Sequence, residues 1–213
     1  MTTFNAYPVT LTLTQKFQKR IFDLVFSSLG LLLIWWLILL VWIIACIDTR
    51  SNGFFVQKRV GRHGKLFRVV KIKTMRPIAD FNTSVTCLGD PRITILGVFF
   101  RRTKIDELPQ LWNVLIGQMS FVGPRPDVRG YADRLQGEDR IILSIRPGIT
   151  GPAQLAYKNE EEILANQDDE VNYNDEMIWP DKVRINREYI EDYSFFKDFY
   201  YIWKTIADGN VKY

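Results

Sequence analysis

The chain has 213 residues, a length typical of one domain, and a formal net charge of +4. The only histidine, His63, lies in a Gly-rich basic turn, which nearly excludes a Ser-His-Asp triad. Two cysteines cannot build a disulfide framework, and without clustered histidines they argue against a structural zinc site. So few cysteines are typical of a reducing compartment.

The first feature along the chain is an apolar run from Leu24 to Ile47 without a charged residue. A helix of this length rises roughly 36 Å, which is enough to cross a bilayer core of about 30 Å. The run is too long for the apolar part of a signal peptide. We therefore expect residues 1–48 to form an N-terminal tail and membrane helix, and residues 49–213 to form a water-facing domain.

Two short strands are predicted next, at Phe54–Val56 and Leu66–Lys73, on either side of a turn rich in glycine. Alternation along the second strand would place Lys71 and Lys73 on one face, where ligand contact and a solvated edge are both open. The polar residues Asp80–Asp90 are expected to form a mobile loop.

Charge is unevenly distributed in the domain. Between Asp48 and Asp80 the chain has no acid but many lysines and arginines, a bias typical of binding to the phosphates of a nucleic acid, an anionic lipid or a nucleotide. The segment from Glu160 to Glu176 has the opposite bias and is expected to be a solvated loop.

Two neighbouring acids, Asp106 and Glu107, precede a stripe of apolar residues at helical spacing, and Gly117 should end this helix, expected at Leu108–Leu115. Because proline is tolerated only in the first turn of a helix, Pro109 places the acids at the helix N-terminus. Acids there could simply complement the helix dipole.

The basic neighbours of this pair favour chemistry instead. Arg101 and Lys104 lie just before it, and Arg125 stands between Pro124 and Pro126. Two prolines fix the backbone around one guanidinium, which suits a preorganised phosphate contact. Carboxylates among arginines, close to a membrane segment, suggest metal-assisted phosphoryl transfer.

The C-terminal segment Tyr189–Ala207 mixes aromatic and charged residues at helical spacing. This pattern fits a helix lying in the plane of the lipid headgroups, or an aromatic face packed on the domain. The expected fold class is thus a small, membrane-associated α/β domain, mostly α.

Several motifs now resemble a known family. KRIFD (19–23), KIKTM (71–75), DELPQLWNVL (106–115), MSFVGPRP (119–126) and RPGITG with AQ (146–154) resemble the bacterial sugar transferases, the monotopic phosphoglycosyl transferases. The likeness covers nearly the whole chain after about residue 16, in the order of the family's motifs. The length, with one membrane segment, is similar to the minimal members. The resemblance implies an N-terminal re-entrant membrane helix and interfacial amphipathic helices.

The resemblance also implies a reaction. Such enzymes move a sugar 1-phosphate from a UDP-sugar to polyprenol (undecaprenyl) phosphate and release UMP, the first membrane step of glycoconjugate assembly such as lipopolysaccharide synthesis. It implies that Asp106 is the nucleophile, that Glu107 holds Mg²⁺, and that three cations stabilise the phosphoryl oxygens. These cations are Lys71, Arg101 and Arg125.

Further expectations follow for binding and location. The expected substrate-binding residues are Arg146, Gly148, Thr150, Gly151, Lys73 and Pro124. The catalytic domain should lie on the cytoplasmic face of the bacterial inner membrane. Expected partners are the UDP-sugar, polyprenol phosphate, membrane lipids and downstream glycosyltransferases. Nucleic acid is not expected, because the aromatic residues do not interleave with the basic block.

The chain departs from the family pattern in three places. Trp35-Trp36 stands where the family has Ser-Pro in its membrane helix, Pro152 stands where an aromatic is usual, and Leu155–Asn159 replaces a polar stretch. The first departure concerns the path of the helix through the membrane. The other two concern the shape of the nucleotide loop and the choice of sugar.

Re-entry of the helix is still expected. A straight span would place Lys16, Lys19 and Arg20 outside, against the preference for cytoplasmic positive charge, and would hold Trp35 and Trp36 at the bilayer centre rather than the interface. Helix length alone favours a span. The residues expected to support a bend are Ser27, Ser28 and Gly30.

Two other functions fit parts of the pattern. A membrane-bound nucleotide-sugar hydrolase or phosphatase would use the same acids with water as the acceptor. A non-catalytic, membrane-anchored module that binds anionic lipid would explain the basic block. This second alternative leaves Asp106-Glu107 and the Pro-Arg-Pro motif without a role.

Overall fold

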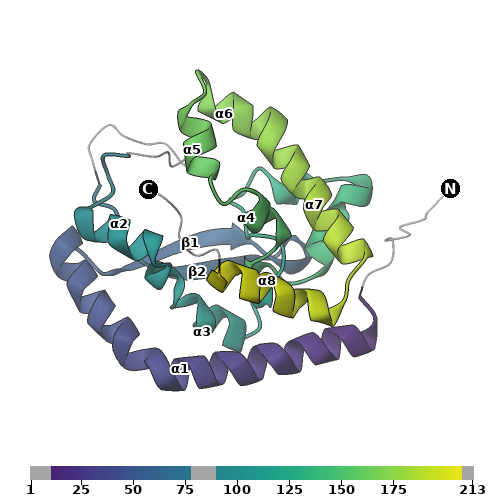
Figure 1. The fold of residues 1–213 in the computed structure, drawn as a ribbon, viewed down its shortest axis with the longest axis horizontal. Coiled ribbons are helices and arrows are strands. Elements are labelled where there is room, and N and C mark those ends of the chain that lie inside the picture. Colours follow the sequence, from purple (N-terminus) through teal and green to yellow (C-terminus); the bar gives the residue numbers. More distant parts are fainter. Residues whose placement is uncertain (1–10, 78–89, 208–213) are drawn as a thin grey trace.

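The computed structural model describes residues 11–77 and 90–207. This part of the chain is mostly helical, with two small two-stranded sheets and one long apolar helix near the N-terminus (Figure 1). The loop expected at Asp80–Asp90 lies, except for Asp90, outside the described residues.

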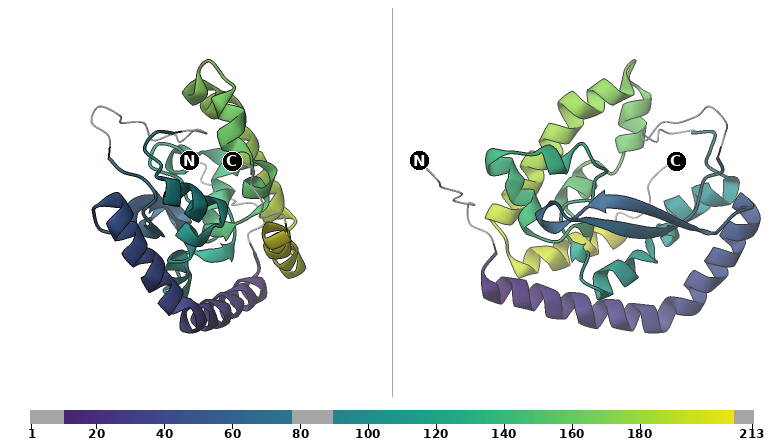
Figure 2. Two further views of the ribbon diagram at one scale, coloured as in Figure 1. Left: turned by 60° about the vertical axis from the view of Figure 1, so that its left-hand side comes forward. Right: turned by 180° about the vertical axis from the view of Figure 1, so that it is seen from behind.

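The long helix, α1, is continuous from Leu13 to Thr49, and within the described ranges it is the one helix long and apolar enough to cross a membrane. It bends near its middle, as the two views of Figure 2 also show. The Ser27 hydroxyl donates to the Asp23 carbonyl at 2.5 Å, and such back-bonding within a turn often bends helices. Gly30 lets Leu111 approach, since a Cβ there would lie 3.1 Å from that side chain.

Both halves of α1 pack against the rest of the protein. In the N-terminal half, the Asp23 carboxylate accepts a hydrogen bond from the Ser120 hydroxyl at 3.0 Å. In the C-terminal half, Val41 packs in a buried cluster with Ile72 and Phe100. The domain therefore lies on the concave side of the bent helix (Figure 2).

The two sheets differ in direction. Strands β1 (Phe54–Val60) and β2 (Leu66–Ile72) are antiparallel, and their connection contains the 3₁₀ turn η1 (Arg62–Gly64). This confirms the predicted strand pair, although β1 extends four residues beyond the prediction. Strands β3 (Ser120–Val122) and β4 (Gly148–Thr150) are parallel.

The segment that carries the acidic pair has three pieces: α2 (Ile95–Arg102), the 3₁₀ turn η2 (Ile105–Glu107) and α3 (Gln110–Leu115). The predicted helix is present, but it begins at Gln110 rather than Leu108. The acids consequently lie in the separate 3₁₀ turn η2, immediately before the N-terminus of α3.

A buried asparagine fixes α3 to the sheet. The Asn113 Oδ1 accepts from the Val70 amide at 3.2 Å, and its Nδ2 donates to the Arg68 carbonyl at 2.7 Å. These are the backbone groups of β2 that face away from β1. The Asn113 side chain therefore forms the hydrogen bonds that a third strand would otherwise form at this edge. This contact fixes the position of η2 relative to Lys71 on β2.

The remaining elements surround the second sheet. They are η3 (Ala132–Arg134), η4 (Gly137–Ser144), α4 (Pro152–Ala156), α5 (Glu160–Ala165), α6 (Glu170–Tyr173), the π-turn η5 (Asn174–Ile178), α7 (Trp179–Glu191) and α8 (Phe195–Ala207). The main core lies between η4, β3 and α7 and includes Ile141, Val122 and Val183. The acidic segment is solvated as predicted, with Asp168 and Asp169 exposed, but it is not a loop, because α5 and α6 occupy most of it.

The predicted C-terminal helix is broken after Glu191 and continues as α8. Large apolar residues of α8 are exposed: Phe196, Phe199, Tyr200, Trp203 and Ile206. The acid Asp198 instead points inward and pairs with Lys19 of α1 at 2.5 Å, with the Tyr189 and Tyr193 hydroxyls also donating to it. This helix thus turns its apolar face outward while an internal ion pair attaches it to α1.

Candidate active site

The acidic pair lies at a sharp change of chain direction. Lys104 adopts a left-handed backbone conformation (φ 58°) that ends α2 and leads into η2. The Glu107 amide donates back to the Lys104 carbonyl at 3.1 Å. As a result Asp106 is buried, with 8% of its surface exposed, and Glu107 lines a cavity.

Two cations from different elements converge on Glu107. Its Oε1 accepts from Lys71 Nζ of β2 at 2.7 Å and from Arg125 Nη2 at 3.4 Å. Burial alone would raise the pKa of Glu107, but the charges of Lys71 and Arg125 outweigh it and hold this pKa well below its usual range. Glu107 is therefore ionised at every pH at which the protein is expected to work.

The pKa of Asp106 is shifted in the opposite direction. Burial, together with the charge of Glu107, raises the pKa of Asp106 to about 6. Its Oδ1 is buried and has no hydrogen-bond partner in the described part of the chain. A buried carboxylate oxygen left without a partner is unusual and suits an atom that reacts or binds a ligand.

Arg125 is positioned by the second sheet. The residue before it, Pro124, accepts a hydrogen bond from the Gly148 amide at 2.8 Å. A Cβ on Gly148 would lie 2.2 Å from the Gly123 backbone nitrogen, so this close approach requires glycine. Gly151 has the same role, because a Cβ there would lie 2.4 Å from the Gly123 carbonyl oxygen.

Arg101 reaches the same region from α2. Its Nη2 donates to Glu161 Oε1 of α5 at 2.7 Å, and its charge acts to lower the pKa of Asp106. Its other terminal nitrogen, Nη1, is buried without a hydrogen-bond partner among the described residues. Arg101 thus links Glu161, which lines the cavity, to the segment that carries the acidic pair.

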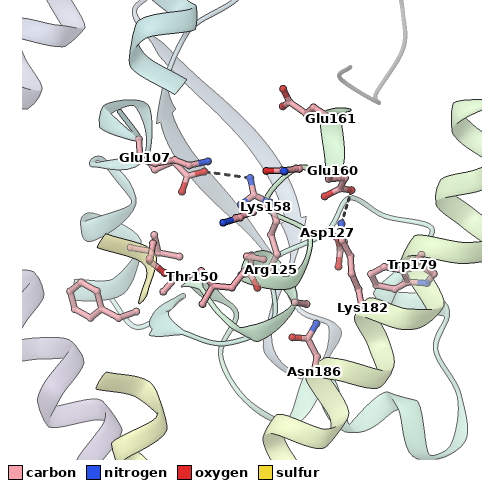
Figure 3. Close-up of a pocket in the computed structure, with 18 of the residues that line it drawn as sticks. Glu107, Arg125, Asp127, Thr150, Lys158, Glu160, Glu161, Trp179, Lys182 and Asn186 are labelled. Atoms are coloured by element: carbon pink, nitrogen blue, oxygen red, sulfur yellow. Dashed lines mark hydrogen bonds and ion pairs between the residues drawn. The ribbon is translucent and has the colours of Figure 1, made fainter. Parts of the chain in front are cut away.

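The cavity has a volume of about 430 Å³, within the range of small-molecule sites. Three of the expected residues line it, namely Glu107, Arg125 and Thr150. Figure 3 shows Glu107 on one side, residues of α7 on the other, and Arg125 between them. The structure therefore brings Glu107 and Arg125 to one end of the cavity, and residues of α7 form its other end.

Other expected residues lie outside the cavity lining. Arg146 donates from Nε to the Gly117 carbonyl at 2.8 Å, and Lys73 donates to the Ser51 hydroxyl at 2.8 Å. In the structure these two side chains support loops. The substrate contacts that the resemblance implies for Arg146, Gly148, Gly151, Lys73 and Pro124 stay predictions.

The structure adds residues to which the sequence analysis gave no role in the site. They are Asp127, Gln154, Glu160, Trp179, Lys182 and Asn186, all lining the cavity. Burial raises the pKa of Asp127 to about 6. Asp127 could have been noticed beside the Pro-Arg-Pro motif, whereas the α7 residues carry no local signal.

The donor set fits one hard divalent cation. The described residues contain no group of three or more His, Cys, Asp and Glu that could hold a metal alone. Mg²⁺, however, is usually held by one or two carboxylates together with substrate phosphates. Glu107, which lines the cavity next to the buried Asp106, is one such carboxylate and fits this role.

Comparison with known proteins places these residues in a family. The model of a family described as "Bacterial sugar transferase" matches residues 14–210. The chain is 32% identical, over 91% of its length, to a UDP-galactose-lipid carrier transferase of Erwinia amylovora, and 34% identical, over 93%, to an undecaprenyl-phosphate glucose phosphotransferase of Komagataeibacter xylinus. It is 29% identical, over 88%, to the exopolysaccharide production protein ExoY of Rhizobium meliloti. The chain spans 40%, 38% and 83% of the lengths of these relatives.

The raised pKa values of Asp106 and Asp127 can be measured directly. In protein with ¹³C-labelled aspartate side chains, in detergent and without divalent cations, we expect Asp106 and Asp127 to protonate near pH 6, because burial favours their neutral forms. Asp181, whose pKa is lowered by its hydrogen bonds to Tyr157 and Arg184, serves as an internal control. Substituting each of the two acids by asparagine assigns its signal. Titration of Asp106 at or below about pH 4 would contradict this description.

Proposed function

The chain belongs to the bacterial sugar transferase family, and we propose that it transfers a sugar 1-phosphate from a UDP-sugar to polyprenol phosphate and releases UMP. The observation that carries this proposal is the acidic pair in a family-matched segment, with a buried, unpartnered oxygen on Asp106 beside the cations at Glu107. The names of the relatives support the acceptor and the transferred group.

Asp106 is the nucleophile in this proposal. Its Oδ1 attacks the phosphorus that carries the sugar, the bond from that phosphorus to the UMP oxygen breaks, and UMP leaves. A phosphosugar ester of Asp106 remains. An oxygen of polyprenol phosphate then attacks the same phosphorus, the bond to Asp106 breaks, and the products are a polyprenol diphosphate sugar and a free carboxylate. Because the pKa of Asp106 lies near 6, the carboxylate is mostly ionised at neutral pH and becomes inactive as the pH falls.

The cations around the pair have separate tasks. Arg125 lines the cavity and can contact the phosphoryl oxygens with two nitrogens, and Lys71 balances the charge of Glu107 while the diphosphate binds. Arg101 can reach the same oxygens if Glu161 releases it. Glu107, with Asp106 beside it, would hold the Mg²⁺ that the family resemblance implies, and such an ion would neutralise charge on the diphosphate.

The path of α1 supports a re-entrant anchor in the bacterial inner membrane. Both halves of the bent helix pack on one domain, which a straight crossing of the bilayer would prevent. The outward apolar face of α8 fits a helix lying in the membrane surface. With UDP-sugar as donor, the domain would lie on the cytoplasmic face, where its product becomes the acceptor of downstream glycosyltransferases.

Covalent catalysis predicts a detectable intermediate. Incubated with Mg²⁺ and a UDP-sugar but no acceptor, the protein should gain the mass of one sugar phosphate, and polyprenol phosphate should remove it faster than water does. Asp106→Asn should form no adduct and lose at least about 10³-fold in turnover, because an amide is not a competent nucleophile. Removal of divalent cations by EDTA should suppress the adduct. Normal turnover by Asp106→Asn would exclude this mechanism.

The re-entrant path predicts that both ends of α1 are cytoplasmic. In a chain with Cys46→Ala and Cys87→Ala, a cysteine at Thr3 should resist an impermeant maleimide in intact spheroplasts and react after permeabilisation. Asp168→Cys, in the exposed segment between α5 and α6, is the matched control and should behave identically. If the Thr3 cysteine reacts in intact cells while the Asp168 cysteine does not, the helix spans the membrane.

A further inference from the structure

One face of α7 forms the end of the cavity opposite Glu107. Trp179, Lys182 and Asn186 recur at i, i+3 and i+7 on this helix, and all three line the cavity. Figure 3 shows them together, across Arg125 from Glu107. Asn186 is the most buried of the three, with only 4% of its surface exposed.

Asn186 has an unused hydrogen-bonding group in this position. Its Oδ1 is buried and has no partner among the residues that the structure describes. The two ends of an amide present an acceptor and donors, so either orientation of the side chain leaves a polar atom for a ligand. Because an unpaired buried polar group is costly, its presence on a cavity wall indicates that the bound state supplies the partner.

Gln154 of α4 provides a second such group on the same cavity. Its Nε2 donates to the Gly123 carbonyl at 3.2 Å, which fixes the orientation of the amide. Its Oε1 is then an acceptor, and this oxygen is also buried without a partner in the described ranges. The amide groups of two helices therefore each have a buried polar atom without a partner, among the described residues, in one cavity.

This end of the cavity carries one ion pair and one further carboxyl group. Lys182 Nζ pairs with Glu160 Oε1 at 2.6 Å, and the carboxyl of Asp127 lies on the same side of the cavity (Figure 3). Carboxylates here repel a diphosphate but accept hydrogen bonds from hydroxyl groups. The ring of Trp179 adds a flat apolar surface. A neutral ring carrying several hydroxyl groups matches this combination.

We propose that Asn186 and Gln154 bind hydroxyl groups of the sugar that is transferred, and so determine which sugar the protein selects. This inference rests on the proposed function, because it places the reacting phosphorus beside Asp106, Glu107 and Arg125. The sugar is bonded directly to that phosphorus, whereas uridine is separated from it by a second phosphate. The hydroxyl-bearing ring nearest to Arg125 is consequently the sugar.

Binding can be measured without turnover in the full-length Asp106→Asn chain, in detergent with Mg²⁺. The ligands are UDP-galactose, UDP-glucose, UDP-N-acetylgalactosamine and UMP, measured by calorimetry. Asn186→Leu keeps the size of the side chain and removes both polar atoms. The matched control is Asn172→Leu, an exposed asparagine of α6 outside the cavity lining.

We expect Asn186→Leu to raise the Kd of the best-bound UDP-sugar about 3- to 10-fold, the range for one lost hydrogen bond, and to change the ranking of the three sugars. The Kd of UMP and all values for Asn172→Leu should stay constant. The unchanged Kd of UMP also shows that the variant is folded.

Three results would overturn the inference. Asn186→Leu could raise the Kd of UMP as much as that of the UDP-sugars, which would assign the residue to the nucleotide, or it could raise no Kd at all. The third is that, with Asn186 and Gln154 in place, no UDP-sugar binds more tightly than UMP. A failed proposed function looks different. In that case the sugars bind and depend on Asn186, but the chain with Asp106 intact forms no phosphosugar adduct.

Discussion

The site depends on two neighbouring carboxyl groups in one 3₁₀ turn whose pKa values are shifted in opposite directions. Lys71 and Arg125 keep Glu107 ionised, and the charge of Glu107, added to burial, raises the pKa of its neighbour Asp106. Two like charges so close would repel without these cations. Glu107 is thereby suited to bind a cation, and Asp106, with its unpartnered oxygen, is suited to react. As free side chains the two carboxyl groups would have similar pKa values.

The rest of the fold fixes the elements that carry these side chains. Asn113 binds α3 to the open edge of β2 and so sets the distance between η2 and Lys71. The close parallel pairing of β3 with β4 places Arg125, and Asp23 of α1 holds the start of β3 through Ser120. The apolar helix is therefore part of the scaffold of the site as well as a candidate anchor.

The sequence alone predicted the parts of this arrangement that are local. The strand pair, the apolar helix and the acidic pair before the short helix have short-range patterns. The short extent of α3, the break before α8 and the helices in the acidic segment depend on tertiary packing, which periodicity does not report. Asn186 could not have been found, because an isolated asparagine on an amphipathic helix is ordinary until a cavity forms around it. Arg146 illustrates the reverse: its family motif is present, yet the side chain contacts the Gly117 carbonyl.

The central claim is that transfer proceeds by two displacements at one phosphorus, the first by Asp106. The stereochemical course tests it most directly. A UDP-sugar with sulfur in place of one non-bridging oxygen on the sugar-bearing phosphorus is chiral there, and so is the polyprenol diphosphate product. Each in-line displacement inverts the configuration. The account predicts overall retention between a single diastereomer of the donor and the product. Inversion would mean direct attack by polyprenol phosphate and would contradict the covalent role of Asp106.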